Sequence, residues 1–136
     1  LIGLTPFGTR AFVVIQRGDS EPEYTNHLPE GELGFDPRFI LVDIQRTLLS
    51  LVHGQLPESG ERLARVGEED LIEIWNEGRL LERRFRQQGR AGRAGQFIIT
   101  YGDEGFRFGE EPGQIEIRNE RLGYELTLRT LSFQLF

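Results

Sequence analysis

The sequence comprises 136 residues, a length typical of one domain, with 38% hydrophobic and 28% charged residues and a net charge of −6. This acidic balance argues against a nucleic-acid partner, because binding to phosphates requires a surplus of cations. The absence of cysteine excludes disulfides, thiolate metal sites and a cysteine nucleophile from this sequence. We expect a single domain over residues 1–136, and the absence of methionine predicts a processed chain or a fragment.

The first predicted elements are two strands joined as a hairpin. Residues 11–16 contain four consecutive large apolar side chains, a pattern typical of a strand that is buried on both faces. Residues 17–20 form a polar turn, and residues 23–26 are expected to return as a short second strand. A loop rich in proline and glycine follows.

The next predicted element is an amphipathic helix. Asp36 is a favourable N-cap, and Pro37 suits the first helical position because its missing N–H has no helical partner there. Large apolar side chains recur at helical spacing at Ile40, Ile44, Leu48 and Leu51. We expect this helix to continue until Gly54 and Pro57 stop it, and to lie against a hydrophobic surface.

From residue 61 onward, short apolar segments alternate with glycine or charged turns, as in a β-meander. The predicted strands are residues 62–66, 71–75, 80–85, 96–101, 105–108 and 114–118. Residues 87–95 are rich in glycine and arginine and predict a flexible loop.

The last predicted strand changes its phase. Side chains alternate on one face at Leu122, Tyr124, Leu126 and Leu128, and the opposite phase continues at Leu131, Phe133 and Leu135. Such a slip at residues 130–131 predicts a bulge or bend, which curves a sheet. The expected fold class is therefore α+β and mainly antiparallel β, with a curved half-barrel sheet covered by one main helix.

Residue types that carry catalysis are poorly placed in this sequence. His27 and His53 have no neighbouring carboxylate at metal-ligand spacing, and no serine lies in the sequence context of a hydrolase nucleophile. The acidic residues 68–70 and 110–111 adjoin turns, where solvated charge is the simpler explanation. We expect no enzymatic activity, no metal site and no cofactor.

Five segments resemble a known family: residues 4–12, 37–45, 95–101, 115–119 and 123–128. Together and in this order they resemble a family of uncharacterised bacterial lipoproteins related to LolA and LolB, often encoded among aryl-polyene pigment genes. The resemblance implies a half-barrel whose hydrophobic cavity holds the acyl chain of a lipid or lipoprotein. It also implies a place in the periplasm or on the periplasmic face of the outer membrane. Further N-terminal strands and a lipid anchor for membrane association would then lie outside residues 1–136.

Strand parity and helix spacing select the residues that would line such a cavity. On the strands these are Phe12, Val14, Phe97, Ile99, Tyr101, Ile115, Ile117, Tyr124, Leu126 and Leu128, and on the helix Ile40, Ile44 and Leu48 would form a lid. The alternative is a structural or protein-interaction module whose core is filled and whose strand edges pair with a partner chain. A shorter resemblance of residues 116–124 to carboxypeptidase-regulatory-like β modules belongs with this alternative.

Overall fold

The computed structural model describes residues 1–4, 7–32, 34, 36–87 and 95–129. The chain forms two compact units, residues 1–49 and residues 50–136. Each unit has its own hydrophobic core. The prediction of a single domain stays a prediction.

The first unit is a three-stranded antiparallel sheet with one helix against it. The strands are β1 (Ile2–Leu4), β2 (Arg10–Ile15) and β3 (Glu23–Asn26), paired in the order β1-β2-β3. β2 pairs with β3 from Phe12–Asn26 to Ile15–Glu23, which confirms the predicted hairpin. The helix α1 (Pro37–Leu48) contacts β2 and β3.

The start of α1 follows from its cap. The Asp36 side chain accepts a hydrogen bond from the Arg38 backbone N–H at 3.0 Å, and Pro37 stands at the predicted first position. The helix ends earlier than predicted, because Leu49 is extended with φ −90° and ψ 147°. Leu51 falls outside α1 and packs against the core of the second unit. Its helical spacing from Ile40 therefore does not place the two residues on one helix face.

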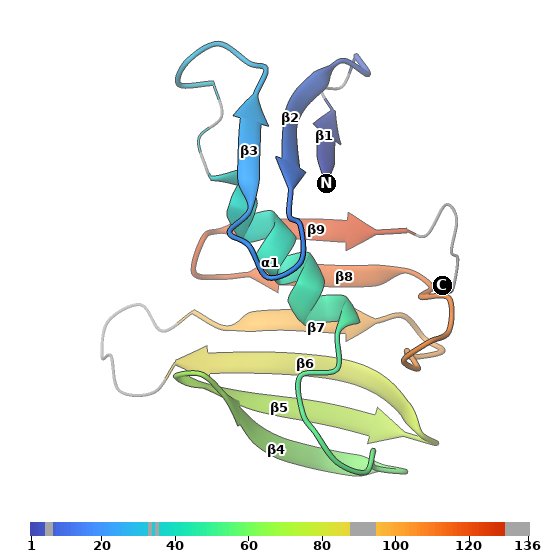
Figure 1. The fold of residues 1–136 in the computed structure, drawn as a ribbon. Coiled ribbons are helices and arrows are strands. Elements are labelled where there is room, and N and C mark those ends of the chain that lie inside the picture. Colours follow the sequence, from blue (N-terminus) through green and yellow to red (C-terminus); the bar gives the residue numbers. More distant parts are fainter. Residues whose placement is uncertain (5–6, 33, 35, 88–94, 130–136) are drawn as a thin grey trace. The chain divides into compact units, whose positions relative to one another are not determined.

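The second unit is a six-stranded antiparallel sheet whose strands follow one another in chain order (Figure 1). Its strands are β4 (Gly60–Val66), β5 (Glu69–Asn76), β6 (Arg79–Gln87), β7 (Phe97–Tyr101), β8 (Ile115–Asn119) and β9 (Tyr124–Leu128). The predicted meander is confirmed in this order. The described sheet is open, with β4 and β9 at its edges.

Two predicted strand segments are wrong in part. Residues 105–108 form no strand: Phe106 makes only an isolated bridge to Leu80, between two glycines with positive φ at 105 and 109. Leu122 lies in the turn before β9, because Gly123 with φ 72° reverses the chain there. The phase change at residues 130–131 lies outside the described residues, as do residues 88–94 of the predicted loop.

The fold class is therefore mainly antiparallel β with one short helix. The described strands are divided between two open sheets, whereas we expected one curved sheet. α1 has 12 residues and packs on the smaller sheet of its own unit. The half-barrel covered by a main helix stays a prediction.

Candidate ligand-binding face

The six-stranded sheet has two unlike faces. Along β5, β7 and β8, side chains alternate between buried and more exposed positions. We call the side that carries Leu71, Phe85 and Phe97 the apolar face. The opposite side, which carries Glu82 and Arg118, is the polar face.

Eight of the predicted cavity residues lie on the apolar face. Ile99 pairs with Ile117 and Ile117 with Leu126, so these three side chains form one row across β7, β8 and β9. Residues paired directly across strands share a face, which places the neighbouring rows on the same side. The eight are Phe97, Ile99, Tyr101, Ile115, Ile117, Tyr124, Leu126 and Leu128.

Burial is uneven along this face. The predicted residues of β7 and β8 are at most 2% exposed, whereas those of the edge strand β9 are half-buried. Leu51, Val52 and Phe108 of the same unit pack against this core. The buried part is thus a filled core, and the edge strand leaves part of the apolar surface accessible.

The other predicted residues belong to the first unit. Phe12 and Val14 are buried in its core, where Ile40 packs against them. Ile44 is half-buried, and Leu48 is 38% exposed. The lid role of the helix residues stays a prediction.

A row of three charged side chains also lies on the apolar face, and sequence reasoning missed it. Arg62 of β4 pairs with Glu73 of β5, and Glu73 pairs with Arg83 of β6. The side chains of Glu73 and Arg83 are 0% exposed, and that of Arg62 is 13% exposed. We call these residues the charged row. Their parity was available from the sequence, since Glu73 lies two residues from both Leu71 and Trp75.

Glu73 is the acceptor at the centre of the charged row. Its Oε2 accepts from Arg62 Nε at 2.7 Å and from Trp75 Nε1 at 3.2 Å, and its Oε1 accepts from Arg83 Nε at 2.9 Å. The Arg62 guanidinium lies over the Trp75 ring at 5.4 Å, and that of Arg83 lies over the Phe108 ring at 5.2 Å. Buried charges of this kind need both pairing and hydrogen bonds to be tolerated.

Tyr101 joins the charged row to the aromatic part of the core. Its ring stacks on Phe106 at 5.4 Å, and Phe106 meets Phe108 edge-on at 5.2 Å. Burial raises the pKa of the Tyr101 hydroxyl above its ordinary value, although a hydrogen bond with Arg83 and the charge of that residue oppose the shift. The phenol is therefore neutral at physiological pH.

A groove of about 530 Å³ opens where β7 and β8 meet the loop of residues 102–114. Tyr101, Phe106 and Ile115 give it an apolar floor, and acidic side chains such as Asp103 and Glu111 stand around it. Two of the predicted cavity residues, Tyr101 and Ile115, are therefore next to an opening.

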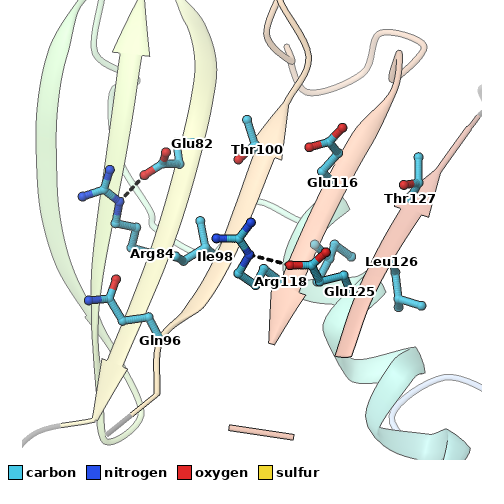
Figure 2. Close-up of a pocket in the computed structure, with 11 residues that line it drawn as sticks. Glu82, Arg84, Gln96, Ile98, Thr100, Glu116, Arg118, Glu125, Leu126 and Thr127 are labelled. Carbon is cyan, nitrogen blue, oxygen red and sulfur yellow. Dashed lines mark hydrogen bonds and ion pairs between the residues drawn. The ribbon is translucent and has the colours of Figure 1, made fainter. Parts of the chain in front are cut away.

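The polar face carries a second groove, of about 430 Å³ (Figure 2). Charged and hydroxyl side chains line it, and two ion pairs cross its surface: Arg84 with Glu82, and Arg118 with Glu125 at 2.8 Å. Ile98 lies between these ion pairs in Figure 2, and Leu126, labelled beside Glu125, also borders the groove. A surface so rich in charge suits water better than an acyl chain.

The comparisons with known proteins identify a family. Residues 1–132 match the family described as "Protein of unknown function (DUF3261)". Searches of curated proteins and of solved structures returned no match. None of the described helices has the length and apolar character needed to cross a membrane. Within the described residues, no three histidine or acidic side chains are grouped to hold a metal ion.

Proposed function

We propose that this chain, which belongs to the DUF3261 family of proteins of unknown function, binds an apolar ligand on the apolar face of its second unit. The ligand is the acyl chain of a lipid or of an acylated lipoprotein. The protein binds this chain without altering it chemically. Such binding would support the transport or localisation of lipids or lipoproteins in the bacterial cell envelope.

The row Ile99, Ile117 and Leu126 is the observation that carries this proposal. It runs across three neighbouring strands and is flanked by aromatic and aliphatic side chains of the same face. The row ends on the edge strand β9, where Leu126 and Leu128 are only half-buried. An acyl chain laid along it would remove apolar surface from water at roughly 25 cal/mol per Å².

Ligand entry requires movement, because Ile99 and Ile117 are covered. The groove beside Tyr101 and Ile115 is one place where an acyl chain could begin to enter. Side chains that pack on this core, such as Phe108, would then move, and the ligand would replace part of their contacts. The LolA/LolB resemblance supports a site in the periplasm or at the outer membrane, reached through a lipid anchor outside residues 1–136.

The second candidate function is a structural or interaction module with a filled core. The burial of the β7 and β8 side chains favours it. The open edges β4 and β9 would then be the places where a partner strand pairs.

Titration with a neutral NBD-labelled monoacylglycerol separates the two functions. We expect saturable binding that Leu126→Gln weakens and Thr127→Gln leaves unchanged, since these neighbours on β9 lie on opposite faces. Circular dichroism verifies that both variants are folded. Absence of saturable binding by the folded chain would refute the ligand and support the filled module.

A further inference from the structure

The charged row and the aliphatic row are one continuous line of side chains. Register places Arg62, Glu73 and Arg83 directly beside Ile99, Ile117 and Leu126, from β4 to β9. Neighbouring strands are about 4.8 Å apart, so this line extends about 24 Å along the sheet. One half of the line is charged and the other half is aliphatic.

Fold stability does not explain the charged half. Replacing a buried ion pair by apolar side chains of similar volume is often neutral or stabilising, because desolvation offsets the attraction between the charges. The neighbouring positions on this face are occupied by large buried apolar side chains, Leu71, Phe85 and Trp75. The charges therefore point to a task other than stability.

Arg62 is the member of the charged row that a ligand can reach. It lies on the edge strand β4, and its side chain is 13% exposed, against 0% for Glu73. Its Nη2 lies 2.5 Å from Oε2 of Glu73 and is paired with that carboxylate, which Arg83 shares. Two guanidinium groups and one carboxylate leave the charged row with one positive charge in excess, which an anionic head group at the edge strand would balance.

We infer that the ligand of the apolar face is an anionic amphiphile with its head group at Arg62. The carboxylate or phosphate of the head group accepts hydrogen bonds from the guanidinium, which Glu73 and Trp75 hold in place. The acyl chain continues along Ile99, Ile117 and Leu126. This inference rests on the proposed function and names the chemical class of its ligand.

Four lipids with the same oleoyl chain test the inference by displacement of the neutral NBD probe. Oleate carries a carboxylate and oleoyl lysophosphatidic acid a phosphate monoester, whereas oleoyl lysophosphatidylcholine is zwitterionic and monooleoylglycerol is neutral. We expect at least one of the two anionic lipids to displace the probe at concentrations about tenfold lower than the neutral lipid, as charge-assisted hydrogen bonds contribute. The better of the two anions identifies a fatty acid or a phosphate-bearing lipid as the source.

Arg62→Gln and Arg65→Gln form a matched pair of variants. Both remove one arginine charge from β4, but Arg65 lies on the polar face, opposite Asp70. We expect Arg62→Gln to abolish the preference for anions and Arg65→Gln to preserve it. Arg62→Lys, which keeps the charge, should retain part of the preference if the glutamine variant does not fold.

Three results would overturn the inference. Equal displacement by all four lipids on the original chain would refute the anionic head group while leaving acyl binding intact, and it requires no variant. Equal effects of Arg62→Gln and Arg65→Gln in folded proteins would refute the role of Arg62. Failure of the NBD probe itself to bind would refute the proposed function, and the inference with it.

Discussion

Replacing Glu73 by glutamine measures how strongly the charged row depends on its carboxylate. The side chain is fully buried and accepts hydrogen bonds from Arg62, Arg83 and Trp75. Glutamine has nearly the same size but no charge, and its NH₂ group would face a guanidinium donor. The two arginines then lose the carboxylate that they share.

The expected loss of stability is about 3–5 kcal/mol, the usual cost of removing one partner from a buried ion pair. Charge-assisted hydrogen bonds contribute about 1.5–3 kcal/mol each, so independent loss of all three would cost about 4.5–9 kcal/mol, which lies mostly above this range. Arg62 lies on the edge strand and can turn toward solvent, which keeps the total lower. Urea unfolding at neutral pH, followed by fluorescence of the single tryptophan, Trp75, reports on this unit directly.

Glu82→Gln is the matched control on the neighbouring strand. Glu82 pairs with Arg84 on the polar face, where the side chains are 21% and 37% exposed. Loss of such a pair costs about 0–1 kcal/mol. An equal loss for Glu73→Gln and Glu82→Gln would refute the reasoning. Replacing Arg62, Glu73 and Arg83 together by methionine should change the free energy of unfolding little, in contrast to Glu73→Gln alone.

Three further predictions concern the helix cap, the buried phenol and the core. Asp36→Ala should lower the stability of the first unit by about 1 kcal/mol in thermal unfolding followed by circular dichroism, whereas Asp36→Asn, which keeps the capping acceptor and loses only the ion pair with Arg38, should lower it less. The hydrogen bond from the Arg38 side chain lowers the pKa of Asp36, so this ion pair stabilises the fold above about pH 4 and its contribution disappears as the pH falls toward the lowered value. Burial raises the pKa of Tyr101, so stability should fall as the pH rises above about 10, where an unfolded tyrosine ionises, and Tyr101→Phe should reduce that slope. Ile99→Ala should cost about 2–5 kcal/mol in urea unfolding and Ile98→Ala, on the polar face, clearly less; equal losses would contradict the assignment of faces.

Local chemistry made several elements predictable. Asp36 and Pro37 specify the start of α1, because a capping carboxylate and a proline satisfy the first helical turn. Alternation of side chains located β7 and β8 and placed Phe97, Ile99 and Ile117 on one face. In these segments the local pattern and the tertiary environment favour the same structure.

Other features depend on contacts between distant segments. Leu51 continues the helical spacing of α1, but it belongs to the second unit and packs against the core of that unit. Phe106 suits a strand, yet the glycines around it allow one bridge to Leu80 only. Neither contact can be read from a local window of sequence.

The charged row was hidden by the assumption that arginine and glutamate face water. Arg83 stands between the half-buried Glu82 and Arg84 in β6, and its parity matches that of Phe85. Its burial becomes predictable only when the partner on β5 is known, because a carboxylate at the paired position compensates the charge. Register across strands, which sequence patterns do not specify, decides such cases.

Native mass spectrometry of the chain after incubation with a bacterial total lipid extract tests acyl binding most directly. The proposed function predicts a complex of the protein with lipid, lost in Leu126→Gln and retained in Thr127→Gln. If the original chain and both variants are folded and each shows only the mass of the protein without lipid, the apolar face is a closed core. The acyl-binding function is then wrong.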